Sequence, residues 1–596
     1  MTHLTGVLSQ SGTWQVFVPQ LLVALVLFLV GANWGLPSRA PDRFLFGPHQ
    51  LWTGHAILLL AGSKDGSNEQ AADVSSWPLD RSHGAVTVNS TDRDRARIVR
   101  RYRLMSYQPD EFATFAALAQ FKPSHLGFDP RMYKYGGLWV YPVGVLLKLA
   151  GSVGLVRLNP DAAFYLDRPE EFGRFYVVAR CYSAAWGLAG VVAVFLLAHR
   201  CCGNGPAAAC GALCFMFMPV VITAAHEAKP HLAGTVLTLL AVLAGAMFVE
   251  HGRRRSALAA AILCGAAIGM VPSACPVLLV LPGMMVLRRL LRADGVTTTR
   301  IILNATAWTS LSALVYFVAN PYVLINLVRD RAVLQSSFGN SAAFYHVGVS
   351  QAGLSNTICL IGLGTSFVLA FAGMLGGIAL AWRASQVKCT SLQELRRRAA
   401  GTLLALVTLP VAIVFLFFAA KQPADYARFA LSFDVFLAIE AVVAVATFVR
   451  SPLLRGLSLC VLVVTTGFTS SFYLCGFIRD SSGRSSRLAD ASRLDDLLRL
   501  GGRLMATREE PAPWSLPPVD LFRWELVVPP RGLPRESPDA NADVTVGPAN
   551  LSSLTNGIGL LTSTPISWAA KPFDMEVAGH RLGETGAGNL PRSAVH

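Results

Sequence analysis

The chain is poor in charged residues. Only 15% of its 596 residues are Asp, Glu, Lys or Arg, whereas 53% are hydrophobic and the mean hydropathy is +0.47. A soluble protein would carry about 25% charged residues. This shortage excludes an ordinary soluble enzyme, and the recurring long apolar runs predict a polytopic membrane protein.

Cysteine is also absent where a disulfide framework would need it. The chain has 11 cysteines, but they lie in apolar runs, in basic loops or at the end of the last apolar run. The long hydrophilic regions 38–174 and 476–596 contain none. If these regions are exported, they fold without disulfide bonds, and no cysteine spacing indicates a zinc site.

Several motifs of other protein classes are missing. The sequence has no Walker motif, no dinucleotide-binding fingerprint and no internal repeat visible by eye. The first apolar run, Val16–Val30, has no basic residues just before it and no small-residue cleavage site after it, which predicts an uncleaved first helix. The net charge of +15 comes from arginines gathered in short loops between apolar runs, so we expect no nucleic-acid partner.

The apolar runs predict an all-α membrane protein with about 11 transmembrane helices. After Val16–Val30 these runs are Val177–Ala198, Ala207–Ala225, Leu232–Val249, Ala257–Val271, Pro276–Val286, Ile301–Ala319, Thr357–Trp382, Thr402–Ala420, Phe429–Val449 and Leu457–Leu474. Residues 1–476 would form the membrane domain, with a long external first loop at 34–174. Residues 477–596 would form a small extracytoplasmic region, partly disordered after a helix and a strand at Leu521–Val528.

The segment from Lys134 to Leu147 decides the orientation. It is aromatic, rich in glycine and ended by Lys148, which favours an interfacial helix over a full crossing. With the N-terminus cytoplasmic, this choice places the arginine clusters on the cytoplasmic side and the C-terminus outside, as the positive-inside rule requires. A crossing would reverse the clusters. We therefore predict a multi-pass protein of the plasma (inner) membrane.

The first external loop contains an acidic motif. Asp110 and Glu111 follow Pro109 and precede an apolar helical run that begins at Phe112. Proline and acidic residues are also ordinary at a helix N-terminus, so a simple helix cap is the alternative. Other polar residues at predicted external helix ends are Tyr141, Arg180, His226, Glu227, Lys229, Lys421 and Arg428.

Taken in order, these motifs resemble the C-type (GT-C) glycosyltransferase superfamily, and within it the protein mannosyltransferase and aminoarabinose transferase group. The matching features are the Pro-Asp-Glu of the first loop, the Tyr-Pro of the following helix, the arginine of the second span, the His-Glu-Ala-Lys-Pro that ends the third, Asn320-Pro321-Tyr322 and the Tyr-Ala-Arg-Phe that opens a late span. The sequence departs from the group at His231, where relatives often have aspartate, and after Phe429, where the usual proline is missing.

The resemblance implies transfer of a sugar from a polyprenyl phosphate to a protein, lipid or glycan outside the cytoplasm, with no required cofactor. A carboxylate can take the proton of the acceptor hydroxyl. We assign this role to Asp110, with Glu111 as alternate, although neighbouring side chains on a helix diverge by about 100°. The charge of the lipid phosphate requires cations. Lys229, Arg180, Arg428 and Lys421 are the candidates, and Tyr141, His226 and Glu227 complete the expected substrate-binding set.

Other hypotheses stay open. Arg180 and Arg428 could instead extend to lipid headgroups. His226, His231 and Glu227 could bind a divalent metal, but a further ligand at a fixed spacing is missing, so we expect none. A transporter would use the intramembrane acids Asp434 and Glu440 as an ion site and should show repeated halves. A structural membrane protein would not explain the acidic motif beside the bilayer.

Overall fold

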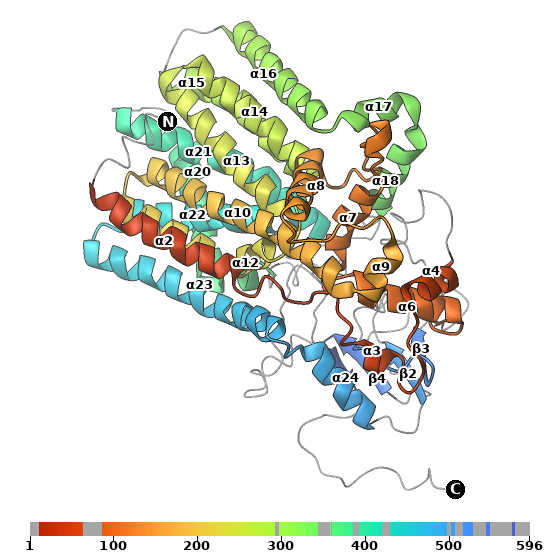
Figure 1. Ribbon diagram of the computed structural model, residues 1–596. Coiled ribbons are helices and arrows are strands. Elements are labelled where there is room, and N and C mark those ends of the chain that lie inside the picture. The colour runs from red at the N-terminus through yellow and green to blue at the C-terminus, as the bar shows by residue number, and fades with distance from the viewer. Residues whose placement is uncertain are drawn as a thin grey trace.

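The computed structural model describes residues 11–62, 86–292, 297–343, 358, 360–384, 392–419, 430–497, 502–506, 517–528, 544–548 and 575–578. This part of the chain is mainly helical, as predicted. Figure 1 shows a bundle of long helices next to a layer of short helices and a small sheet. The layer comes from the first loop and from the C-terminal region.

The bundle contains the predicted apolar runs. Its helices are α2 (Ser11–Leu29), α10 (Pro169–Cys202), α11 (Gly205–Phe217), α12 (Pro219–Ala225), α13 (His231–His251), α14 (Arg254–Met270), η3 (Pro272–Leu279), α15 (Val280–Arg292), α16 (Thr298–Ala319), α20 (Phe367–Ala384), α21 (Leu392–Ala419), α22 (Leu431–Phe448) and α23 (Pro452–Ser481). Within the described residues, six helices are long and apolar enough to cross a membrane, or seven if α11 and α12 form one bent span. All eleven predicted runs coincide with helices, but several are shortened or broken.

Prolines explain two of the breaks. The sequence predicts one helix over Ala207–Ala225, whereas the structure has α11 and α12 at an angle of 60°. Pro219 has no backbone N–H and its ring clashes with a preceding helical turn, so the helix restarts there. Pro272 breaks the next pair as predicted, and the stretch to Leu279 is a 3₁₀ helix.

The arginine-rich loops meet at one end of the bundle. Glu250, buried at the end of α13, forms ion pairs with Arg200 of α10 and Arg396 of α21. Asp110 lies near the opposite ends of α10 and α13. The structure therefore separates the two sets of loops as the orientation argument requires, and the assignment of the arginine end to the cytoplasm stays a prediction.

The predicted interfacial segment forms α8 (Gly137–Ser152), which at 16 residues is short for a membrane crossing. Its N-terminus is fixed to the bundle, because Gly136 N donates to Met270 O at 2.9 Å and Gly137 N donates to Asn320 Oδ1 at 2.7 Å. Trp139 Nε1 donates to Thr114 Oγ1 of α7 at 3.0 Å. These bonds hold the short helix across the end of the bundle.

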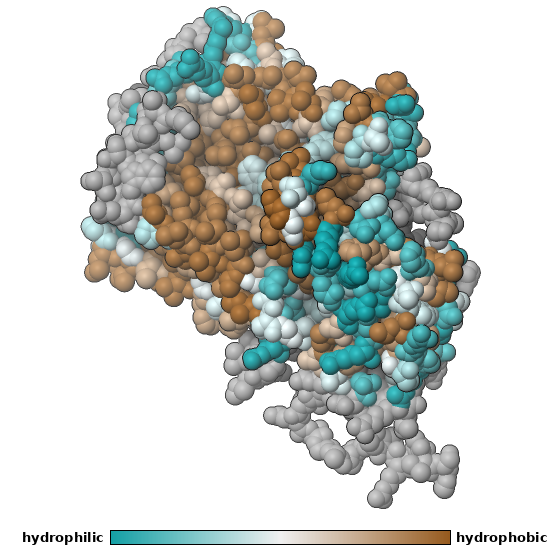
Figure 2. Space-filling model, viewed as in Figure 1, coloured by the Kyte–Doolittle hydropathy of each residue, from teal (hydrophilic) through white to brown (hydrophobic). Residues whose placement is uncertain are grey.

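The other short helices complete the layer: α3 (Asp42–Leu45), α4 (Gly54–Ala61), α6 (Asp92–Leu104), η1 (Pro109–Glu111), α7 (Phe112–Ala119), η2 (Pro123–His125), α9 (Ala162–Asp167), α17 (Pro321–Arg329), α18 (Arg331–Ala343) and α24 (Ser486–Leu497). In the view of Figure 2, apolar residues gather over the bundle and hydrophilic residues over this layer. This distribution matches a bundle in the bilayer and a layer outside it.

The described strands form a five-stranded sheet that joins the first loop to the C-terminal region. Its strands are β1 (Val86–Thr87), β2 (Gly502–Ala506), β3 (Trp524–Val528), β4 (Val544–Pro548) and β5 (Met575–Ala578), in the order β1-β3-β2-β4-β5. The β2 strand is parallel to β3 and β4, whereas β1 and β5 run antiparallel at the edges. The predicted strand at Leu521–Val528 is confirmed over Trp524–Val528 as β3, whereas residues 521–523 form a turn. The pairing of β3 with the first loop was not predicted.

Asn89 fixes the C-terminal region to the first loop. Its side-chain amide donates to Leu521 O at 2.9 Å and to Trp524 O at 2.6 Å, and accepts from Leu526 N at 2.9 Å. The side chain is buried. These three bonds satisfy backbone groups in and just before β3, so the external layer is built from both hydrophilic regions together.

Candidate active site

The acidic motif forms the short helix η1 and the start of α7. Pro109 occupies the first position of η1, where its missing N–H costs nothing. The two carboxylates then diverge, as helical geometry predicts. The Asp110 side chain is 29% exposed and the Glu111 side chain is fully buried.

Glu111 is enclosed by hydrogen-bond donors. Its carboxylate accepts from Arg180 Nε at 2.9 Å, from Arg180 Nη2 at 2.6 Å, from Ala228 N at 2.6 Å and from the Ser106 hydroxyl. Arg180 Nη1 donates to Ala32 O and to Trp34 O, at 2.9 and 2.6 Å. Arg180 is also fully buried. Within the described residues, the pair thus contacts protein groups on every side that the hydrogen bonds show, and its expected roles in catalysis and phosphate binding stay predictions.

Lys229 lies between two carboxylates. Its ammonium is 3.1 Å from Glu227 Oε2 and 3.7 Å from Asp110 Oδ2, and its side chain is 3% exposed. Gln108 Nε2 donates to the other oxygen of Glu227 at 3.1 Å. The charge of Lys229 is thus shared between a buried acid and the partly exposed Asp110.

Two hydrogen bonds set the distance between Asp110 and Lys229. The Glu111–Ala228 bond joins the residue after Asp110 to the residue before Lys229. The Gln108–Glu227 bond joins the same two segments two residues before Asp110 and two residues before Lys229. These two bonds flank Asp110 on one segment and directly precede Lys229 on the other, so they join the acidic loop to the end of the broken span. The sequence does not reveal this link, since it connects residues more than 100 positions apart.

His226 is held inside the protein rather than toward a ligand. Its ring nitrogens lie 2.7 Å from Val30 O and 2.8 Å from Ile222 O, and its ring stacks on Phe477 with centroids 4.4 Å apart. Burial lowers the pKa of His226, despite the two carbonyls. Both nitrogens face carbonyl oxygens, and a neutral ring donates to only one of them, so metal binding would displace a contact that fixes the ring. In the described part of the chain, no three His, Cys, Asp or Glu side chains are grouped to hold a metal.

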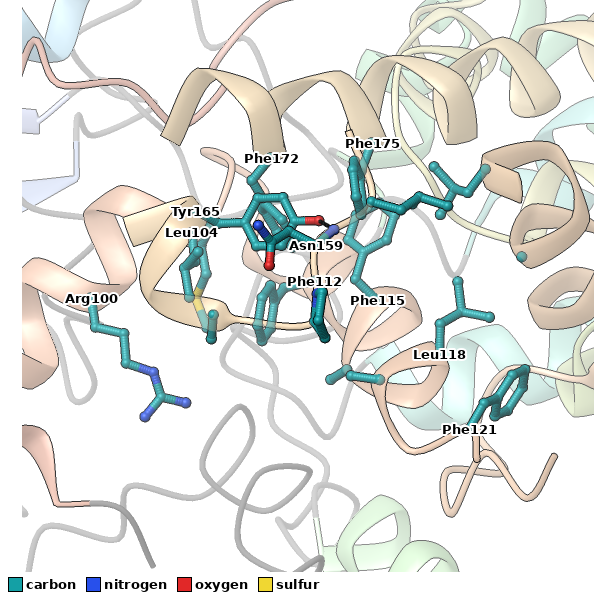
Figure 3. Close-up of a pocket in the computed structure, with 18 of the residues that line it drawn as sticks. Arg100, Leu104, Phe112, Phe115, Leu118, Phe121, Asn159, Tyr165, Phe172 and Phe175 are labelled. Carbon is teal, nitrogen blue, oxygen red and sulfur yellow. Dashed lines mark hydrogen bonds between the residues drawn. The ribbon is translucent and has the colours of Figure 1, made fainter. Parts of the chain in front are cut away.

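The expected substrate residue Tyr141 lines a large cavity in the external layer. The cavity has a volume of about 1720 Å³. Figure 3 shows the aromatic rings of Phe112, Phe115, Tyr165, Phe172 and Phe175 grouped in it, with Arg100 to one side. Asp110 is not a lining residue, but α7, which follows it, forms one wall.

The remaining predicted residues fall into two groups. Lys421 and Arg428 lie outside the described residues. Asp434 and Glu440 are buried on α22, where Glu440 accepts from Thr408 Oγ1 at 2.9 Å. Within the described residues, neither carboxylate oxygen of Asp434 has a hydrogen-bond partner. In the described part of the chain, Asp434 and Glu440 share no hydrogen bond or ion pair.

A row of arginines near the site was not predicted from the sequence. Arg93, Arg97, Arg100 and Arg101 of α6 all line the cavity. Their spacing of i, i+4, i+7 and i+8 places them on one face of a helix, and this pattern is visible in the sequence. The cavity that they line is formed by segments far apart in the sequence, so the sequence does not reveal it.

No protein-family model matches the chain, and no curated protein matches it. Among the solved structures that match are two of one protein. One is ArnT from Cupriavidus metallidurans bound to undecaprenyl phosphate, with 18% identity and a TM-score of 0.40 over 73% of this chain and 72% of that chain. The other is the same protein in the apo state, with 15% identity and a TM-score of 0.42 over 85% and 96%. Similarity at this level assigns no residue a role.

Proposed function

We propose that the protein is a membrane glycosyltransferase that moves a sugar from a polyprenyl phosphate to an acceptor hydroxyl at the external face. The observation that carries this proposal is the pair of Asp110 and Lys229. A partly exposed carboxylate stands 3.7 Å from a buried ammonium at the end of the helix bundle. This is where a lipid-linked sugar would present its phosphate and its reactive carbon.

Asp110 is the general base in this proposal. An acceptor hydroxyl is a weak nucleophile at neutral pH, and a carboxylate within hydrogen-bond reach takes its proton as the sugar bond forms. The positive charge of Lys229 favours the carboxylate form, which is the form that accepts a proton. The 29% exposure of the Asp110 side chain leaves it open to an acceptor, in contrast to Glu111.

Lys229 also stabilises the departing group. As the sugar leaves, negative charge grows on the lipid phosphate, and a cation held in place beforehand lowers the barrier. Glu227 and Gln108 orient the lysine from the buried side. Lys421 and Arg428 remain sequence-based candidates for the same phosphate, and we propose them as helpers to Lys229.

Glu111 and Arg180 position the reacting groups. They touch no substrate, but the Glu111–Ala228 bond fixes the loop of Lys229 against the loop of Asp110. Misplacing a catalytic group by about 1 Å can cost 10²-fold in rate. We therefore propose that this buried pair and Gln108 fix the distance between Asp110 and Lys229.

The test is a transfer assay with the purified full chain in nanodiscs. Radiolabelled polyprenyl-phosphate sugars are incubated with the protein and an extract of the host envelope, and labelled product and released polyprenyl phosphate are measured. We expect stoichiometric release with at least one sugar, and none when a nucleotide sugar replaces the lipid donor. Absence of transfer across a panel of hexosyl and pentosyl donors would refute the proposal.

A further inference from the structure

The segment 30–36, which follows α2, joins the last span to the acidic loop. Gly35 N donates to the carboxylate of Asp480 on α23, and Gly35 O accepts from Tyr107 N at 2.8 Å. Gly35 has a φ of 56°, and a Cβ at this position would lie 2.8 Å from the Cβ of Tyr107. Glycine permits both this backbone conformation and this close approach. The end of α23 and the residues just before Asp110 are therefore bound to the same short segment.

Trp34 lies at the centre of this segment and is fully buried. Its indole N–H donates to the carbonyl of His226 at 2.9 Å, and its own carbonyl accepts from Arg180 at 2.6 Å. The guanidinium of Arg180 also lies over the indole, 5.0 Å from the ring centroid. Trp34 thus contacts both the arginine that binds Glu111 and the histidine three residues before Lys229.

Phe477 supports Trp34 from the last span. The Phe477 ring is fully buried, stacks on His226 with centroids 4.4 Å apart, and meets Trp34 edge-on with centroids 5.0 Å apart. Aromatic pairs in these arrangements stabilise beyond the area that they bury. His226 is therefore held at its ring by Phe477 and at its backbone carbonyl by Trp34.

The contacts of His226 determine where the loop of Lys229 begins. His226 follows the last residue of α12, and the two residues after it are bound to other segments. Ser183 Oγ donates to Glu227 O at 2.6 Å, and Ala228 N donates to the acidic motif. Each residue between α12 and Lys229 thus has a fixed partner, so a shift of His226 displaces the lysine.

From these contacts we propose that Trp34 is a positioning residue for the transfer reaction. Supported by Phe477 of α23, it holds the loop of Lys229 against the segment that carries Asp110. This proposal rests on the proposed function, because it concerns the same pair of reacting groups. Trp34 acts through its two polar partners, so its loss changes the geometry of the site, and the last span becomes part of the support of the active site.

The test is Trp34→Phe, which keeps a buried aromatic ring and removes the N–H that binds His226. Backbone hydrogen exchange of residues 226–229 is measured by mass spectrometry on the full chain in nanodiscs, below the melting temperature, together with transfer kinetics. We expect exchange of this loop to rise about tenfold. We expect kcat per folded molecule to fall about tenfold or more, with the donor KM within about twofold, because a misplaced Lys229 affects the transition state.

Trp139→Phe is the matched control. Trp139 is also fully buried and donates through its indole N–H at 3.0 Å, but its partner is Thr114 of α7. This control should lower the melting temperature by a similar amount and leave the exchange of residues 226–229 unchanged. Phe477→Leu tests the same support from α23 if Trp34→Phe does not fold, and it should also raise the exchange of the loop and lower kcat.

The outcomes separate positioning from packing. Where the wild-type protein transfers sugar, the proposal requires both effects, so an unchanged exchange rate or an unchanged kcat in Trp34→Phe would overturn it. Equal exchange of residues 226–229 in the Trp34 and Trp139 variants would also overturn it and leave Trp34 as an ordinary core residue. Because exchange needs no turnover, raised exchange in Trp34→Phe with no transfer by the wild-type protein would count against the proposed function alone.

Discussion

Replacing Glu111 with glutamine should lower the stability of the protein and, separately, slow the transfer reaction. The carboxylate of Glu111 accepts four hydrogen bonds, two of them from Arg180, and both side chains are fully buried. A glutamine of the same shape turns one acceptor oxygen into an amide that faces donors and leaves Arg180 with an uncompensated charge. Breaking a buried pair in this way costs about 3–5 kcal/mol.

The same change should also slow transfer, because Ala228 loses its acceptor and Lys229 loses its fixed distance to Asp110. We expect transfer to fall about 10²-fold. Arg180→Gln should behave alike, and the Glu111→Gln/Arg180→Met double variant should recover part of the stability but not the activity. Thermal unfolding in detergent and initial transfer rates below the melting temperature measure the two effects separately.

The matched control is a second buried pair in the same layer. Arg103 donates to both oxygens of Asp42 at 3.2 and 3.1 Å, and their side chains are 1% and 4% exposed. Asp42→Asn should lower stability by a similar amount and leave the transfer rate per folded molecule near that of wild type. If Asp42→Asn and Glu111→Gln lose the same activity at equal stability, Glu111 has no positioning role.

Further predictions follow from single contacts. Because burial lowers the pKa of His226, the unfolded state takes up a proton that the folded state does not. The free energy of unfolding should therefore fall as the pH drops below about 6.5, and His226→Gln should make that fall smaller in denaturant titrations. A pH dependence unchanged by the variant would contradict this prediction. Asp434→Asn should not reduce stability, since a carboxylate without a hydrogen-bond partner in the described residues is costly to bury, and proton- or sodium-coupled flux that needs Asp434 would favour a transporter. Reporters fused at Ser90 and Ser537 should both be exported, and a cytoplasmic signal from either would reverse the topology.

The sequence was enough to locate the helices and the break at Pro272, but not the break at Pro219. The apolar runs predicted every bundle helix, because burying backbone groups in lipid leaves the helix as the available structure. The run at Ala207–Ala225 was expected as one helix, and Pro219 divides it. The pairing of β1 with β3 was missed, since it joins residues more than 400 positions apart and only tertiary packing selects it.

Only part of the site was predicted, because its contacts also join residues far apart in the sequence. The acidic motif and Lys229 were both placed at external helix ends, and the structure brings them to 3.7 Å from each other. Arg180 was expected to meet phosphate or lipid, because sequence cannot tell a buried ion pair from an exposed cation. The arginine row on α6 had a visible helical spacing but no known cavity to face.

The most direct test of the account is the turnover of Asp110→Asn. Asparagine keeps the shape of the side chain and cannot take a proton at neutral pH, so transfer from a polyprenyl-phosphate sugar should fall by about 10²–10⁴-fold. Donor binding should change little, and the melting temperature should stay near that of wild type, because the Asp110 side chain is partly exposed and lies 3.7 Å from Lys229. Near-wild-type transfer by Asp110→Asn would contradict the account and leave Asp110 as a helix cap.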